Sequence, residues 1–548
     1  MKRSALRSAL PALVLSAVVL LPFLDKPFTI DDTVFLLEAR HALSDPLHPT
    51  AFSVNWDHAY ERVSAIVPTG PVMAWLLVPS IVAGGEEWLA HAVELLALWL
   101  AIVATVSLAL RFGLAPRWAA GAGLLLAATP TALAMGGTAM PDVPAMALGV
   151  AGLERLVAWR DERRWHQAVA AAILLGLAPM TRMHLVLLFG VGALLLVGDP
   201  FAWADWKRGP WTRWVPLAAA AFVTMGVALA TRDPGPGGGT LATAAARFAS
   251  SANLSSNAFA FAIHLGLTSA FAFAWTALRW RSIARRIWVL IAGTALAAFL
   301  LDRTWAVGFQ YALTPVFGLA VAALIDVLVD AWQRRDGLQV ALGAWLLLPL
   351  PTAIYVQLPS KYLLGSAPAV AILLARAMSA RPTAGRRVFA LATVLGAALG
   401  VAILSADSAM AEVGREGARK LIAPQVSAGR VVWYVGHWGF QWYAEKAGAR
   451  CWSTEPPYPI EGDLIASDWN STFPLVKDLE VLTHLGRVED RHTGFRIMSR
   501  EQGAGFYSNV WGYLPLVWGD GSIDAVDLWL AVRRDGDSGE PSMTSGGP

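Results

Sequence analysis

The sequence predicts an all-α polytopic membrane protein with about 13 transmembrane helices, followed by a small C-terminal α/β domain. Of its 548 residues, 56% are hydrophobic and 15% are charged, whereas a soluble domain carries about 25% charged residues. Apolar runs recur from Leu6 to about Leu404, and the rest of the chain has the composition of a globular domain. The net charge of +3 gives no sign of nucleic-acid binding. The single cysteine, Cys451, excludes an intrachain disulfide and a cysteine-based metal site.

The predicted helices follow one another along the chain at short intervals. The first, from Leu6 to Leu24, follows three basic residues and lacks the small residues of a signal-peptide cleavage site, so we interpret it as an uncleaved helix. Several of the other stretches are shorter than the roughly 20 residues that a bilayer requires. These further apolar stretches lie at residues 90–110, 117–134, 142–159, 167–180, 183–198, 214–230, 258–277, 286–301, 309–331, 338–355, 360–378 and 387–405.

The short segment 70–83 decides the predicted orientation. It would be about 21 Å long as a helix, against about 30 Å of hydrocarbon, and Pro71 and Pro79 interrupt it. If it does not span, about 20 Lys and Arg residues face one side of the membrane and about 8 face the other, as expected when the basic side is cytoplasmic. We therefore predict a surface helix here, a cytoplasmic N-terminus and an extracytoplasmic C-terminal domain.

This orientation also defines the predicted domains. Within the C-terminal part, residues 431–434 and 464–466 predict strands and residues 440–447 predict a helix. The Pro/Gly-rich stretch 234–239 lies in an outer loop and could be a mobile lid or a plain connection. We predict a membrane domain at residues 1–405, with a long first outer loop at 25–89. An extracytoplasmic α/β domain follows at 406–533, and a disordered tail at 534–548.

Three carboxylates are the candidate catalytic residues. Asp31 and Asp32 follow the first helix and precede an amphipathic stretch. They could form a general base or a metal ligand at the membrane surface, where burial raises a carboxyl pKa, or they could only cap a helix N-terminus. Asp142 could also be a helix cap, but the predicted orientation puts it on the same side of the membrane as the pair. Three carboxylates on one face favour a catalytic site.

These motifs resemble the family-39 branch of the integral-membrane glycosyltransferases of C-type fold, which includes protein O-mannosyltransferases and bacterial aminoarabinose transferases. Asp31-Asp32 occupies the place of the family's Asp-Glu pair, and Asp142 lies in a match to its second acidic motif. The resemblance covers roughly residues 1–380. Its remaining motifs are Pro68-Thr69-Gly70-Pro71, Thr181-Arg182 and Lys361-Tyr362.

The resemblance implies transfer of a sugar from a polyprenyl-phosphate donor to the hydroxyl of a lipid, glycan or protein acceptor. The reaction would take place on the extracytoplasmic face of a bacterial inner membrane and invert the anomeric carbon. Asp31 would be the general base, Asp32 its supporting or metal-coordinating neighbour, and Asp142 a carboxylate that orients the acceptor or Asp31. The family's phosphate-binding lysine is replaced here by Val67, so another cation must take its role. The candidates are Arg182 and Arg303, followed by Arg62 and Lys361.

Two further questions stay open at the level of the sequence. A divalent metal would suit an oxygen-rich site, and His41, His48 and His58 share the first loop with the carboxylates, but their spacing matches no known ligand motif. The alternative function is a polytopic transporter or lipid flippase without transferase activity, since many spans with buried charges, such as Glu94 and Asp326, would fit it. Against this alternative, no repeat relates the two halves of the chain.

Overall fold

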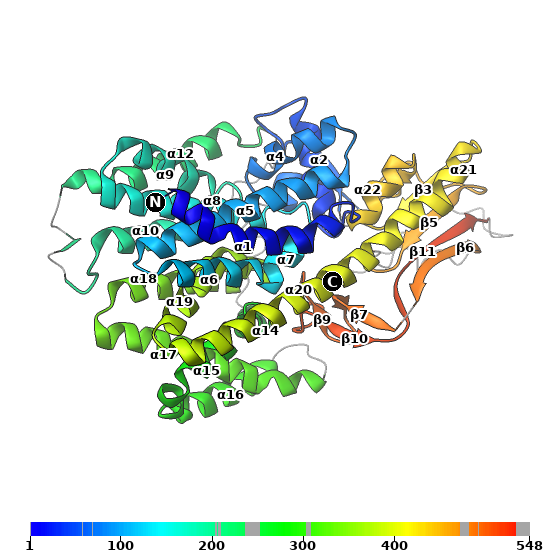
Figure 1. The fold of residues 1–548 in the computed structure, drawn as a ribbon. Coiled ribbons are helices and arrows are strands. Elements are labelled where there is room, and N and C mark those ends of the chain that lie inside the picture. The colour runs from blue at the N-terminus through cyan, green and yellow to red at the C-terminus, as the bar shows by residue number, and fades with distance from the viewer. Residues whose placement is uncertain are drawn as a thin grey trace.

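A bundle of helices and a smaller sheet domain are joined by the long helix α20 (Pro382–Gly417), which runs diagonally through Figure 1. The computed structural model describes residues 2–56, 59–67, 69–202, 205–206, 210–235, 253–302, 308–471, 482–491 and 493–532. The predicted tail 534–548 and most of the stretch 234–239 lie outside these residues.

The first half of the chain is helical apart from one short hairpin, in which β1 (Ser53–Asn55) pairs with β2 (Tyr60–Arg62). Its helices are α1 (Lys2–Leu20), α2 (Asp32–Ala42), α3 (Val63–Ile66), α4 (Val72–Val82), α5 (Glu87–Arg111), α6 (Pro116–Ala127), α7 (Pro130–Met135), α8 (Asp142–Glu162), α9 (Trp165–Leu177), α10 (Leu188–Val197) and α12 (Val215–Ala230). The 3₁₀ helix η2 (Met183–Leu187) precedes α10.

The second half of the bundle continues in the same way. Its helices are α14 (Leu254–Leu267), α15 (Phe271–Ala284), α16 (Ile287–Leu301), α17 (Thr314–Arg334), α18 (Gly337–Leu346) and α19 (Ala367–Ser379). Short 3₁₀ helices precede two of these and follow a third: η5 (Gly308–Leu313), η6 (Leu350–Ile354) and η7 (Ser360–Ser366).

Seven helices of the described residues are long and apolar enough to cross a membrane, or eight if the bent pair α14 and α15 is one span. This is fewer than the 13 predicted from the sequence, although all the predicted stretches are helical. The other five stretches are broken, as at Pro130 between α6 and α7, or short, as in the 13-residue α9, or carry several charges, as in α8. The 11-residue helix α4 lies where the sequence predicts a helix too short to span.

The C-terminal part contains a five-stranded sheet in the order β4-β3-β5-β11-β6. β3 is parallel to β4 and β5, and β11 is antiparallel to β5 and β6. The predicted strands and helix are confirmed as β3 (Val432–Val435), β5 (Leu464–Asp468) and α22 (Trp438–Lys446). The other strands are β4 (Arg450–Cys451), β6 (Leu482–Arg491) and β11 (Ser522–Ala531), with two small sheets formed by β7 (Gly494–Arg496), β8 (Met498–Ser499), β9 (Ala504–Gly505) and β10 (Val517–Gly519).

Helix α20 packs against both parts of the molecule. Small residues let it approach the bundle closely, because a side chain at Gly396 or Gly400 would collide with Ala128 or Leu133. Its other end contacts α22 and β11. The residue 405 boundary predicted between the two domains therefore falls within a continuous helix of 36 residues.

The sheet domain also contacts the loop that precedes α2. The Phe28 backbone N–H donates to the Tyr443 hydroxyl at 2.9 Å, and the Phe28 ring packs edge-on against Trp442. A side chain at Gly439 would overlap the Phe28 carbonyl oxygen. The C-terminal domain is thus packed against the segment that carries the acidic pair.

Candidate active site

The two adjacent aspartates have different environments because of the loop that precedes α2. Ile30 has φ of +42°, an unusual conformation for a β-branched residue, and it turns the chain immediately before the pair. Asp32 is then fully buried, whereas the Asp31 side chain is 31% exposed. Neither side chain caps α2 at its N-cap position, so the simple capping interpretation of Asp31 is not met.

Asp32 forms hydrogen bonds with two segments that are distant from each other in the sequence. Its carboxylate accepts the backbone N–H of Thr29 at 2.8 Å and that of Ala139, also at 2.8 Å. Ala139 lies in the turn that leads into α8 and Asp142. Burial raises the pKa of Asp32 to about 7, against the opposing charge of Lys26 and the two backbone donors. Both oxygens are thus occupied by backbone amides, which fits a residue that positions its neighbour.

Asp31 forms an ion pair with Lys361. The Lys361 ammonium donates to Asp31 Oδ2 at 2.6 Å and lies 5.8 Å from the centre of the Tyr507 ring. The lysine is buried, with a side chain only 2% exposed, in the 3₁₀ helix η7. The partly exposed carboxylate of Asp31 is therefore held by a desolvated cation, which keeps it oriented.

Asp142 and Arg182 form a second, bidentate ion pair beside the first. Arg182 Nε donates to Asp142 Oδ1 at 3.1 Å and Nη2 donates to Oδ2 at 2.6 Å. The guanidinium lies 5.4 Å from the centre of the ring of Tyr362, the residue after Lys361. This contact links the second ion pair to the segment that carries Lys361 of the first. Asp142 begins α8, and Arg182 lies between α9 and η2.

Of the other two candidate cations, Arg62 pairs outside this cluster. Arg62, at the end of β2, forms an ion pair with Asp233, and its Nε donates to Asp233 Oδ2 at 2.9 Å. Arg303 lies outside the described residues. The structure therefore brings together Asp31, Asp142, Arg182 and Lys361 of the residues proposed from the sequence, with Asp32 immediately behind them.

A second buried network, absent from the sequence analysis, supports the same loop. The Lys26 ammonium lies 2.8 Å from Asp407 Oδ2, and both side chains are almost fully buried. The Tyr507 hydroxyl donates to the same oxygen of Asp407 at 2.9 Å, and the Thr29 hydroxyl donates to Oδ1 at 3.3 Å. The only signal in the sequence is the charged residue Asp407, which follows the apolar stretch of α20. Its partners are 100 or more residues away, so spacing could not identify them.

Two buried glutamates near the site lack hydrogen-bond partners among the described residues. They are Glu38 on α2 and Glu94 on α5, and both carboxylate oxygens of each are without a partner. Burial raises the pKa of Glu38 well above its usual value, and the charge of Arg182 opposes this shift. Burial thus favours the neutral, protonated form of Glu38.

The first-loop histidines do not join the carboxylates in the described part of the chain. His48 Nδ1 lies 3.0 Å from Asp45 Oδ2, and His41 packs against Phe52. His58 falls outside the described residues. Among those that are described, no three His, Cys, Asp or Glu side chains gather as metal ligands would. The residues at the site therefore do not form a preformed metal centre.

Several solved structures are similar to this chain over most of its length. ArnT from Cupriavidus metallidurans bound to undecaprenyl phosphate has 16% identity and a TM-score of 0.46, with 95% of this chain and 97% of that chain covered. The apo form of the same protein has 17% identity, a TM-score of 0.42 and coverage of 84% and 92%. The arabinofuranosyltransferase AftD from Mycobacteria has 13% identity and a TM-score of 0.38, with 98% of this chain and 40% of that chain covered.

No protein-family model matches the sequence, and no curated protein matches it. The resemblance expected from the motifs is accompanied by this structural similarity, over nearly the full chain, to ArnT and AftD, which are membrane glycosyltransferases of C-type fold.

Proposed function

We propose that this protein is a membrane glycosyltransferase that moves a sugar from a polyprenyl-phosphate donor to an acceptor hydroxyl, with Asp31 as the general base. The observation that carries the proposal is the pairing of a partly exposed carboxylate with a buried lysine, beside a buried arginine–carboxylate pair. This displacement requires a proton acceptor and positive charge that stabilises the leaving phosphate. The fully buried Asp32 is the less suitable base, because backbone amides occupy both of its oxygens.

The reaction is a single displacement at the anomeric carbon. Asp31 accepts the proton of the acceptor hydroxyl while the acceptor oxygen bonds to this carbon, and the bond to the phosphate oxygen breaks with its electron pair remaining on the phosphate. The configuration of the carbon is inverted. The products are the glycosylated acceptor and a polyprenyl phosphate with one more negative charge than the donor.

Lys361 couples these two changes. As Asp31 takes up the proton it loses its negative charge, so the ammonium 2.6 Å away loses its counter-ion. In the same step the leaving phosphate gains a charge, which the released cation stabilises. Arg182, held by Asp142, is the second cation for the phosphate. Asp142 fixes the guanidinium orientation, and Asp32 fixes the loop that presents Asp31.

The proposed location follows from the charge asymmetry described above. We propose 13 crossings, made up of the long apolar helices and the shorter or broken ones, in a bacterial inner membrane with the N-terminus in the cytoplasm. The site and the domain of residues 406–533 then face outward, where lipid-linked donors are used in place of nucleotide sugars.

The direct test combines the purified protein with a defined polyprenyl-phosphate sugar and a panel of lipid, glycan and peptide hydroxyl acceptors. Mass spectrometry should detect an acceptor heavier by one sugar, together with free polyprenyl phosphate. Asp45→Asn is the matched control, because it removes another carboxylate of the first loop, whose ion-pair partner among the described residues is His48. A protein that carries the intact donor across a vesicle membrane without breaking its glycosidic bond would instead be a transporter, and the proposal would be wrong.

A further inference from the structure

A strongly basic hollow lies at the opposite end of the bundle from the candidate active site. It has a volume of about 580 Å³ and lies between α15, α17 and the turn that joins α19 to α20. Six arginines and one aspartate contribute to its lining. We call it the basic hollow; the arginines are Arg279, Arg281, Arg285, Arg286, Arg334 and Arg381.

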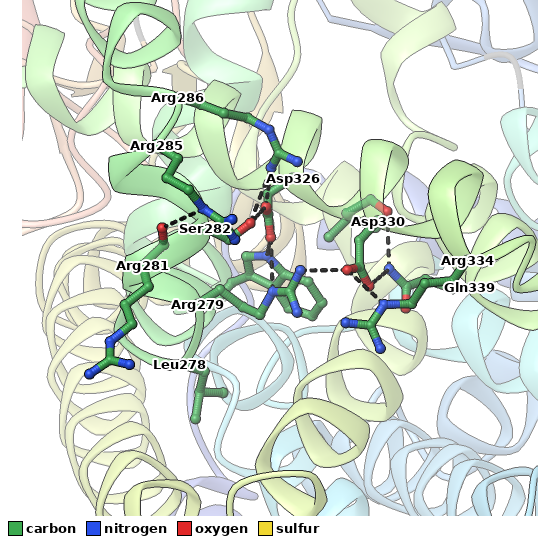
Figure 2. A network of polar contacts seen from close by, with 12 residues as sticks. Leu278, Arg279, Arg281, Ser282, Arg285, Arg286, Asp326, Asp330, Arg334 and Gln339 are labelled. Carbon is green, nitrogen blue, oxygen red and sulfur yellow. Dashed lines mark hydrogen bonds and ion pairs between the residues drawn. The ribbon is translucent and has the colours of Figure 1, made fainter.

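The floor of the basic hollow is a network of ion pairs, shown in Figure 2. Arg279 lies between two carboxylates: its Nε donates to Asp326 Oδ2 at 3.0 Å and its Nη2 donates to Asp330 Oδ1 at 2.6 Å. Arg286 also pairs with Asp326, which is fully buried. Arg334 Nε donates to Asp330 Oδ1 at 2.9 Å. The two aspartates thus fix the arrangement of three of the arginines.

These carboxylates leave most of the positive charge uncompensated. Six arginines against Asp326 and Asp330 give an excess of four positive charges. In the described part of the chain, Arg281 and Arg285 have no carboxylate partner, and Arg381 donates to the backbone carbonyl of Leu278. Carboxylates therefore hold three of the arginines in place, and the other three have no described carboxylate partner. This excess of positive charge suits an anionic ligand.

Exposed tryptophans lie close in sequence to the arginines of the basic hollow. Trp280 lies between Arg279 and Arg281 in the sequence, and Trp288 and Trp332 lie within two residues of Arg286 and Arg334. All three side chains are more than half exposed. Tryptophans that are exposed next to arginines are typical of the level of lipid headgroups. The helix ends that carry the arginines of the basic hollow thus also carry exposed tryptophans.

The position along the helices agrees with this level. The helix α17 has 21 residues, or about 32 Å, which is close to the thickness of the hydrocarbon layer. Its first residue, Thr314, follows η5, whose Gln310 donates to the Gly503 carbonyl of the C-terminal domain at 3.0 Å. Arg334 is at its other end. The basic hollow and the C-terminal domain therefore lie on opposite sides of the proposed membrane.

We propose that the basic hollow binds the phosphate headgroup of an anionic phospholipid of the cytoplasmic leaflet. Charge-assisted hydrogen bonds from arginines suit phosphate oxygens, and the exposed tryptophans and apolar helix faces provide contacts for the glycerol and the acyl chains. A soluble phosphate would bind the arginines but would make no contact with the exposed tryptophans. The site is distinct from the proposed donor site, since it lies at the other membrane surface.

The test compares two charge-matched double variants of the full-length protein in lipid nanodiscs. Arg281→Gln/Arg285→Gln removes the two arginines without carboxylate partners, and so leaves the floor intact. Arg117→Gln/Arg164→Gln removes two exposed arginines of the same predicted cytoplasmic side that do not line the hollow. Native mass spectrometry counts the phosphatidylglycerol or cardiolipin molecules that stay bound when phosphatidylcholine is in excess.

We expect the wild-type protein and the Arg117/Arg164 variant to retain anionic lipid in preference to phosphatidylcholine. The Arg281/Arg285 variant should bind it at least about tenfold more weakly, since each arginine near an anionic surface contributes about fivefold to affinity. Equal loss in both variants would mean that the attraction is only general charge, and would overturn the site. Displacement of the lipid by millimolar inorganic phosphate would show that a soluble anion is the ligand, and would overturn the lipid assignment. Neither measurement depends on sugar transfer.

Discussion

Replacing Asp31 by Asn separates a catalytic role from a purely structural one. Asn keeps the size of the side chain and can still accept a hydrogen bond from Lys361, but it cannot take a proton from an acceptor hydroxyl. If Asp31 is the general base, the catalysed rate should fall by about 10²–10⁴-fold. The donor affinity should change by only a few-fold, because the cations that hold the phosphate are still present.

The same substitution also has a structural cost that must be measured separately. Lys361 is 2% exposed and would lose its only described carboxylate partner. Breaking a fully buried ion pair costs about 3–5 kcal/mol, but about one third of the Asp31 side chain is exposed, so solvent screens the pair and we expect about 1–3 kcal/mol. Thermal unfolding in detergent gives this value independently of activity.

The double variant Asp31→Asn/Lys361→Gln then decides between the roles. Removing both charges should restore the stability toward that of the wild type, because no unpaired ammonium is left buried. The transfer rate, measured as sugar-bearing acceptor formed at saturating donor, should be as low as in Asp31→Asn or lower, because Lys361 also stabilises the leaving phosphate. A double variant that recovers both stability and rate would show that Asp31 serves only as the partner of Lys361, and our assignment of the base would be refuted.

Three other predictions concern the neighbouring groups and the orientation. Arg182→Gln should weaken donor use about 10- to 100-fold through the loss of a charge-assisted hydrogen bond, and adding Asp142→Asn should not restore it; recovery in that double variant would mean that Arg182 only neutralises Asp142. Because burial raises the pKa of Asp32 from 3.8 to about 7, the folded state holds more protons than the unfolded state in that interval, so stability should fall as the pH rises from about 4 to about 7. Asp32→Asn should reduce this slope in unfolding midpoints, and an unchanged slope would contradict the assignment. In a background without the native cysteine, Ile460→Cys should react with an impermeant thiol reagent on intact cells and Arg117→Cys only after permeabilisation; equal labelling of both would overturn the orientation.

Much of the helical organisation could be predicted because it depends on local composition. Apolar stretches form helices in a membrane whatever they pack against, since their backbone groups have no other partners there. The number of long spans was harder to predict, because Pro130 and the bend between α14 and α15 break stretches whose composition looks continuous. The hydrophobic pattern of a sequence shows which residues are apolar, but it does not show where a helix bends.

The gathering of Asp31, Asp142, Arg182 and Lys361 could be anticipated only in part. The distribution of basic residues predicts that these four residues lie on one membrane surface. It does not predict which of them form ion pairs with each other. The pairing of Lys361 with Asp31 joins residues 330 positions apart. The difference between Asp31 and Asp32 was equally inaccessible, because it depends on the positive φ of Ile30.

The buried partners of the loop show why a one-dimensional pattern fails here. Lys26, Asp407 and Tyr507 form a network that spans the bundle, α20 and the C-terminal domain. Each residue alone has the sequence context of an ordinary loop, helix or domain residue. Their function in holding the acidic loop becomes visible only when the C-terminal domain is in place, as it is through the contact of Phe28 with Tyr443.

The burial of Glu38 supports the proposal that Asp31 is the base. Near Arg182, an ionised Glu38 would repel the donor phosphate, but burial raises its pKa well above the usual value and favours the neutral form. The two cations, Arg182 and Lys361, are then balanced by Asp142 and Asp31 before the donor binds. During transfer the proton acceptor and the leaving phosphate change charge in opposite directions. In a poorly solvated site, moving negative charge from the base to a distant phosphate costs free energy. This distance is short when the base contacts a cation that also binds the phosphate. Asp31 meets that condition through Lys361, whereas the oxygens of Asp32 contact only backbone amides.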